Sequence, residues 1–231
     1  MASIAPVSSS VPGLEKHTNH QSSVVASPSE PRCTSIIFDL GDVLFTWSAE
    51  TKTSISPRLL YEILRSSTWN AYERGDVGED ECYALVADQF HVPASEVAAA
   101  FQGARDSLVG SPDMINMIRE LKSSAPDLRV FAMSNISAPD WEVLKEKATQ
   151  EEWALFDRVF TSAEARERKP ELGFYRQVIE GTGVDPTKTV FVDDKLENVQ
   201  SARELGITGI VFDSFESVSK QLLDLVVEKR D

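Results

Sequence analysis

Three acidic side chains stand where apolar runs of this sequence end. The run Ser35–Phe38 is followed by Asp39, and the run Thr189–Val192 is followed by Asp193 and Asp194. A short apolar run that stops at a charged residue is typical of a buried parallel strand whose carboxyl end opens onto a ligand site. If the two strands are neighbours, three carboxylates meet at one edge of a sheet. Hard oxygen ligands of this kind hold Mg2+.

A hydroxyl, an amide and a lysine could complete such a site. Ser134 and Asn135 follow the apolar run Val130–Met133, and Lys169 lies between a polar segment and a helix start. Donors of these types bind phosphoryl oxygens, and a carboxylate nucleophile splits phosphate-ester hydrolysis into two easier steps. Each residue alone has an ordinary explanation, such as a helix cap or a solvated charge. Their joint occurrence beside strand ends favours one common site.

In order and spacing these stretches resemble the haloacid dehalogenase (HAD) superfamily, most of whose members are phosphatases. The resemblance extends from about Ser35 to the C-terminus. It implies that Asp39 is a nucleophile that becomes an aspartyl-phosphate and that Lys169 pairs with both nucleophile and phosphate. It also implies phosphoryl binding by Ser134 and Asn135. It implies Mg2+ as the cofactor, held by Asp39, the backbone carbonyl of Gly41, Asp193 and Asp194.

One position departs from the pattern of many HAD phosphatases. These enzymes carry a second aspartate two residues after the nucleophile, which protonates the leaving oxygen and then activates the water. The sequence has Gly41 at that position, and Asp42 follows it. Loss of a general acid costs roughly 10²–10⁴ in rate. Asp42 is therefore a candidate stand-in for the acid/base, provided that its loop turns it inward.

The elements around these residues predict an α/β protein. Strands that alternate with helices imply a three-layer, Rossmann-like core with a parallel sheet. We expect this core to comprise residues 34–45 and 111–231. The block 46–110 looks wholly helical, with one helix from Ser56-Pro57 to Arg74, a second from Glu79 and a third from Ser95. The resemblance implies that this block is a cap that selects the substrate.

The net charge and composition of the chain limit the kinds of partner that it can bind. The formal net charge is −14, which disfavours nucleic acid and anionic membranes as partners. The two cysteines, Cys33 and Cys82, fit a reduced, cytoplasmic protein without disulfides. The expected partner is a small-molecule phosphate, and the sequence leaves the oligomeric state unknown. Residues 1–33 hold eight Ser and four Pro, and we expect a disordered tail.

The substrate and the class of reaction stay open at this point. The stretches Phe38–Phe45 and Tyr72–Gly75 resemble fungal HAD-type proteins of terpenoid gene clusters, some of which act on prenyl phosphates or diphosphates. Aromatic cap residues would suit an apolar substrate or the cap's own core: Trp47, Trp69, Tyr72 and Phe101. The alternatives are a catalytically impaired HAD domain that only binds, a 2-haloacid dehalogenase-type relative and a terpene cyclase-type relative. The sequence lacks a Gly-x-Ser-x-Gly elbow and a P-loop, which argues against serine hydrolases and P-loop kinases.

Overall fold

A computed structural model describes residues 1–2 and 33–226 of the chain. The predicted tail therefore lies almost entirely outside the described residues. Its last residue, Cys33, is an exception, because it is 3% exposed and belongs to the hydrophobic core. Among the described residues, no helix is both long enough and apolar enough to cross a bilayer.

Five parallel strands form the central sheet, in the order β5-β4-β1-β6-β7. Their bounds are β1 Ser35–Phe38, β4 Arg129–Ser134, β5 Arg158–Thr161, β6 Thr189–Asp193 and β7 Thr208–Val211. The central strand β1 pairs with β4 on one side and with β6 on the other. The three central strands β1, β4 and β6 are buried along almost their whole length and read as apolar runs in the sequence. The prediction of a parallel α/β fold is confirmed.

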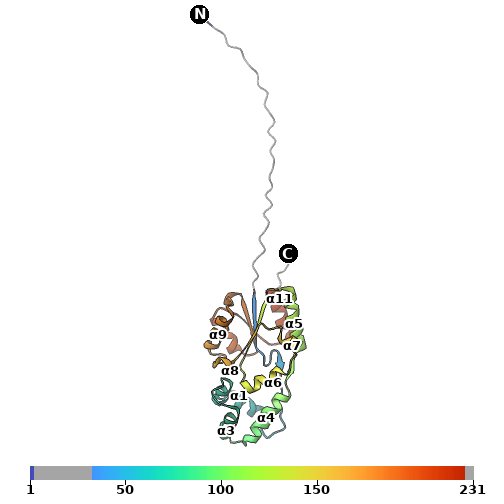
Figure 1. The fold of residues 1–231 in the computed structure, drawn as a ribbon, viewed down its shortest axis with the longest axis vertical. Coiled ribbons are helices and arrows are strands. Elements are labelled where there is room, and N and C mark those ends of the chain that lie inside the picture. The colour runs from blue at the N-terminus through green and yellow to red at the C-terminus, as the bar shows by residue number, and fades with distance from the viewer. Residues whose placement is uncertain (3–32, 227–231) are drawn as a thin grey trace. The chain divides into compact units, whose positions relative to one another are not determined.

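Helices cover both faces of the sheet. Figure 1 shows α9 (Leu172–Thr182) on one side and α5 (Pro112–Ser124) with α11 (Phe215–Val226) on the other. The α10 helix (Leu196–Glu204) packs with α9. Shorter elements connect these layers: α6 Ala138–Lys145, α7 Gln150–Trp153, α8 Ser162–Ala165 and the 3-10 helix η1 Pro186–Lys188.

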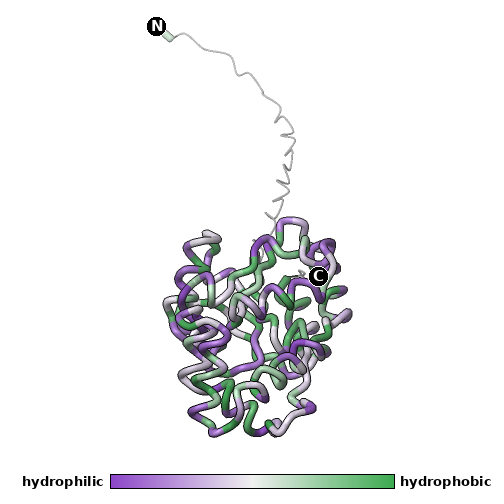
Figure 2. The backbone as a smooth tube through the Cα atoms, turned by 60° about the horizontal axis from the view of Figure 1, so that its bottom comes forward, coloured by the Kyte–Doolittle hydropathy of each residue, from purple (hydrophilic) through white to green (hydrophobic). Residues whose placement is uncertain are grey.

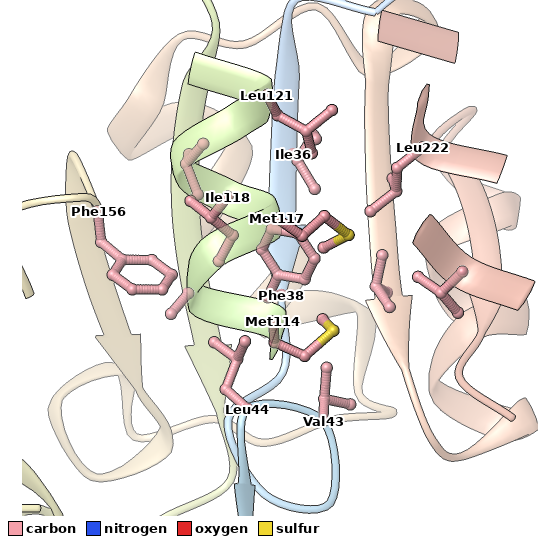
Figure 3. Packing of buried hydrophobic residues seen from close by; sticks show 14 of the residues in the cluster. Ile36, Phe38, Val43, Leu44, Met114, Met117, Ile118, Leu121, Phe156 and Leu222 are labelled. Atoms are coloured by element: carbon pink, nitrogen blue, oxygen red, sulfur yellow. The ribbon is translucent and has the colours of Figure 1, made fainter. Parts of the chain in front are cut away.

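Alternation along β1 divides the core into two clusters of buried side chains. Ile36 and Phe38 face α5 and α11, where Figure 3 shows them beside the methionines of α5 and Leu222. Ile37 points to the opposite face and packs with residues of α9 and α10. This alternation follows the two-residue period of a strand. In Figure 2, apolar and polar segments alternate along the chain, as expected for helices with one buried side.

Four of the five helices between β1 and β4 form a group apart from the sheet. They are α1 Pro57–Leu64, α2 Ser67–Glu73, α3 Glu79–Phe90 and α4 Ala94–Asp106, and we call them the cap. Figure 1 places α1, α3 and α4 together at the end of the sheet where α6 lies. The cap has its own hydrophobic cluster, in which Trp69 stacks on Phe101 with ring centroids 4.0 Å apart.

The prediction that the block 46–110 is wholly helical is wrong at both ends. Two short strands, β2 (Phe45–Thr46) and β3 (Val109–Gly110), pair antiparallel, with Phe45 opposite Gly110. A two-residue strand is too short to show an alternating pattern in sequence. The chain therefore leaves and re-enters the core through one hydrogen-bonded ribbon.

Two predicted helices are each divided. Ser66 accepts a hydrogen bond from the amide of Trp69, which ends α1 and starts α2 where one helix was predicted. The sequence also predicts one helix from about Pro139 to Gln150, but α6 ends at Lys145 and a capping box formed by Thr149 and Glu152 starts α7. In both cases a side-chain hydroxyl satisfies free backbone N–H groups and favours a new helix start.

Candidate active site

The register of the three central strands brings the predicted acids together. Phe38 is aligned with Val192 of β6 and with Ala132 of β4. The residues that follow, Asp39 and Asp193, therefore leave the sheet side by side. The carboxylates of Asp39, Asp193 and Asp194 offer ligand atoms within 4.8 Å of one another.

Lys169 is buried between two of these carboxylates. Its side chain is 1% exposed, and its Nζ lies 2.8 Å from Asp39 Oδ1 and 2.7 Å from Asp193 Oδ2. Nζ also donates to the carbonyl oxygen of Met133 at 2.9 Å. The three donors of the ammonium are thus directed at three oxygens, two of them charged. The predicted pairing of Lys169 with Asp39 is present in the structure.

Asn135 fixes the backbone of Lys169. Its Oδ1 accepts from the Lys169 amide at 2.8 Å, and its Nδ2 donates to the Lys169 carbonyl at 2.9 Å. The predicted role of Asn135 in phosphate binding would fall to its remaining amide hydrogen or its backbone N–H. That role stays a prediction, whereas the contact with Lys169 was not foreseen.

Ser134 is placed as the phosphate-binding prediction requires. It ends β4, is 4% exposed and lines the same cavity as Asp39 and Lys169. Among the described residues, its hydroxyl has no hydrogen-bond partner, so it is available to a ligand.

Asp193 already accepts hydrogen bonds on both carboxylate oxygens. Oδ1 accepts from the amide of Lys195 at 2.8 Å and from Asn198 Nδ2 at 2.9 Å, and Oδ2 accepts from Lys169. Asp193 is 0% exposed. Asp39, by contrast, receives the Leu40 amide and Lys169 on Oδ1 alone. Oδ2 of Asp39 is therefore the freer atom for phosphorus or metal.

The charged groups of this cluster shift one another's pKa values. Burial raises the pKa of Asp39 to about 7, although Lys169 acts in the opposite direction. Burial also acts to raise the pKa of Asp193, but the charge and hydrogen bond of Lys169 outweigh it and hold that pKa below its ordinary value. Burial would lower the pKa of Lys169, yet the carboxylates of Asp193 and Asp39 raise it. The Lys169 ammonium thus lies between the Asp193 carboxylate, which stays ionised, and the Asp39 carboxyl group, whose pKa lies near neutral pH.

Asp194 and Asp42 stand at the wall of the cavity. Burial raises the pKa of Asp194, opposed by Lys195. Asp42 is exposed, adopts a left-handed backbone conformation with φ 57°, and lines the cavity with Gly41. A Cβ built on Gly41 meets no atom within 4 Å. Packing therefore does not exclude a side chain at position 41.

The residue set fits a hard divalent cation. Asp39 and Asp194 offer carboxylate oxygens that few protein donors occupy, and Gly41 offers a carbonyl on the same loop. Mg2+ favours such oxygen donors and keeps several waters. Asp193 lies within reach as well, but its hydrogen bonds suit it better to holding Lys169.

A cavity of about 770 Å³ opens above the cluster, between core and cap. Polar residues at the strand ends form its floor. Aromatic and aliphatic side chains line part of the walls: Trp47, Tyr61, Leu64, Trp69, Phe101, Leu108, Ile136 and Leu144. Polar side chains of the cap, among them Arg65, Asn70 and Arg105, line the walls as well. Of the predicted aromatic residues, Tyr72 does not line the cavity and is 1% exposed in the cap's own core.

Two charged contacts between cap and core were missed from the sequence. Glu73 Oε2 lies 2.9 Å from Arg168 Nε, and Arg105 Nε lies 2.7 Å from Asp140 Oδ1. All four side chains line the cavity. In the sequence, Glu73 and Arg105 stand among other polar residues of their helices, and no pattern shows that their side chains point toward the core.

Family membership follows from sequence comparison. A model described as haloacid dehalogenase-like hydrolase matches residues 91–212, more than half of the chain. The chain belongs to this family, and the prediction of an HAD-like hydrolase is confirmed. The sesquiterpene phosphatase astK of Aspergillus oryzae is 40% identical over 190 residues, covering 82% of this chain and 95% of that protein.

Two further relatives extend the comparison. The drimenol cyclase drtB of Aspergillus calidoustus is 43% identical over 191 residues, which cover 82% of this chain but 36% of the cyclase. A solved HAD family enzyme from Bacteroides thetaiotaomicron, in complex with magnesium and inorganic phosphate, superposes with a TM-score of 0.63. It is 21% identical and covers 80% of this chain and 98% of its own, which shows the shared fold.

Proposed function

We propose that this chain is a Mg2+-dependent phosphatase that hydrolyses a small prenyl- or terpenoid-type phosphate through an aspartyl-phosphate on Asp39. The observation that carries the proposal is the cluster of Asp39, Lys169 and Asp194 on the floor of a cavity whose walls include many aromatic and aliphatic side chains. The similarity to a sesquiterpene phosphatase and the magnesium in a structural neighbour support it.

Each residue of the cluster has a distinct task in this proposal. Asp39 Oδ2 attacks phosphorus, because Oδ1 is held by the Leu40 amide and Lys169. Lys169 offsets the charge that develops on the phosphoryl oxygens, and the Ser134 hydroxyl donates to one of them. Mg2+ bound by Asp39, Gly41 and Asp194 would reduce the repulsion between carboxylate and phosphate.

The apolar walls indicate the class of substrate. Burying apolar surface contributes roughly 25 cal/mol per Å². A branched hydrocarbon chain would gain this along Trp47, Tyr61 and Leu64, where a sugar hydroxyl would have no partner, although Arg65 and Asn70 also line the cavity. The cap therefore favours a prenyl or terpenoid body over a sugar or a nucleotide.

A phosphate-release screen tests the proposal. Farnesyl phosphate, farnesyl diphosphate, glucose 6-phosphate and a nucleoside monophosphate are compared, with and without Mg2+. We expect Mg2+-dependent release that is highest for a prenyl substrate and abolished in Asp39→Asn. Equal background release by wild type and Asp39→Asn on all substrates would reject the enzyme and favour a domain that only binds. Faster turnover of the sugar phosphate would reject the substrate class.

A further inference from the structure

Glu73 is a largely buried acid of the cap with no task in the chemistry described so far. It is the last residue of α2, its side chain is 12% exposed, and it lines the cavity that holds Asp39. Its Oε2 receives Arg168 Nε at 2.9 Å, and its backbone carbonyl accepts from Ser162 Oγ at 2.7 Å. Two core residues thus fix where this acid stands.

The direction of phosphoryl transfer determines where a proton donor for the leaving oxygen must lie. The attacking and leaving oxygens of the transferred phosphoryl group lie roughly in line. Asp39 attacks from the end of β1, so the leaving oxygen points away from the sheet and toward the cap. Gly41 has no side chain to protonate it, and Asp42 is exposed on the loop that follows β1. Glu73, at the end of cap helix α2, lines the same cavity as Asp39 from the cap.

The charge state of Glu73 suits proton transfer. Burial raises its pKa, and this outweighs the opposing effects of Arg168, Lys195 and Lys169. A carboxyl group with a raised pKa holds its proton closer to neutral pH, as a general acid must. Arg168 contacts one of the two carboxyl oxygens, and its ion pair leaves the other for a substrate.

We propose that Glu73 is the general acid, and then the general base, of the reaction on Asp39. The proposal rests on the proposed phosphatase function. In the first step Asp39 Oδ2 forms a bond to phosphorus, the bond to the leaving oxygen breaks, and that oxygen takes the proton of Glu73. In the second step the Glu73 carboxylate accepts a proton from a water molecule. The oxygen of that water bonds to phosphorus, and the bond between Asp39 and phosphorus breaks.

The test compares two leaving groups in Glu73→Gln. Gln keeps an oxygen that accepts from Arg168, so the contact between cap and core is preserved while the proton is lost. We expect kcat/KM for farnesyl phosphate to fall roughly 10²–10⁴-fold, because an alkoxide needs protonation. With p-nitrophenyl phosphate, whose leaving group is a stable anion, we expect a loss below about tenfold on the same basis. kcat/KM is used because it does not include the later attack of water on the aspartyl-phosphate.

Arg168→Met is the matched control, since it breaks the same ion pair and leaves the acid in place. We expect it to lower kcat/KM for the two substrates by similar factors. The proposal is overturned if Glu73→Gln affects both substrates equally, or if Arg168→Met reproduces its dependence on the leaving group. Failure of the proposed function looks different, because wild type would then hydrolyse neither substrate, or Asp39→Asn would match it.

Discussion

Asn135 and Lys169 are joined by two hydrogen bonds, in which the Asn135 side chain accepts from the amide of Lys169 and donates to its carbonyl. The pair links the end of β4 to the segment before α9 and holds the Lys169 backbone in place. With its backbone fixed in this way, the ammonium of Lys169 lies within contact of Asp39 and Asp193.

The first prediction concerns this pair. In Asn135→Ala both hydrogen bonds are lost and Lys169 gains freedom, so we expect activity to fall about 10²-fold, as for a 1 Å misplacement of a catalytic group. Steady-state phosphate release measures the loss. Asn116→Ala is the control, because Asn116 is exposed on α5 and contacts Arg119. Similar activities in the two variants would contradict a positioning role for Asn135.

Removing the buried cation tests the charge balance of the site. Lys169→Met leaves Asp39 and Asp193 buried without their partner, which we expect to destabilise the fold by about 3–5 kcal/mol at pH 8. Without Lys169 the folded-state pKa of Asp39 rises further and that of Asp193 rises above its unfolded value, so the folded state takes up protons. Stability is then regained as pH falls from 8 to 5.

Urea unfolding at several pH values measures this effect. The free energy of unfolding of the variant, relative to wild type, should increase toward pH 5. A difference that stays constant with pH would show that packing of the lysine stem, rather than its charge, accounts for the loss.

Metal binding should release protons. Because Asp39 has a pKa near 7 without metal, a large share of its carboxyl groups is protonated at pH 6.5. Mg2+ needs the carboxylate, so binding displaces that proton, and affinity should rise by up to about tenfold per pH unit below pH 7 and then level off. Calorimetry in two buffers of different ionisation enthalpy measures the release. Identical binding enthalpies in both buffers at pH 6.5 would contradict it.

Adding an acid at position 41 should increase activity on poor leaving groups. A Cβ on Gly41 meets nothing within 4 Å, so Gly41→Asp should fold normally. We expect it to restore roughly 10²-fold or more of the farnesyl phosphate activity lost in Glu73→Gln, since a positioned acid contributes about that much. Gly41→Asn is the control, with the same shape and no acidic proton. Equal effects of Asp and Asn in that background would show that proton transfer is not what was restored.

The sequence predicted the centre of the sheet well because the three strands there are buried on both faces. The runs ending at Asp39, Ser134 and Asp193 are continuous and apolar, and parallel strands place their carboxyl ends at one edge. The grouping of Asp39, Asp194 and Lys169 followed from that rule together with the family resemblance.

The cap was less predictable, since helical periodicity shows which residues share a face but not what that face meets. Glu73 follows the apolar face of α2, and only its contact with Arg168 shows that it turns toward the core. The break at Ser66 and the β2–β3 ribbon depend on single hydroxyls and on two-residue pairings. Propensities averaged over a window do not resolve features of that size.

The antiparallel pairing of Phe45 with Gly110 has a consequence for how such proteins diversify. Because the chain enters the cap through β2 and leaves it through the paired strand β3, the two ends of the cap segment lie side by side. A different set of helices grafted onto those ends would not disturb the pairing of β1 with β4 and β6. Selection can therefore rebuild the chamber that admits the substrate while Asp39, Lys169 and Asp194 stay unaltered beneath it, provided that the new cap again supplies an acid.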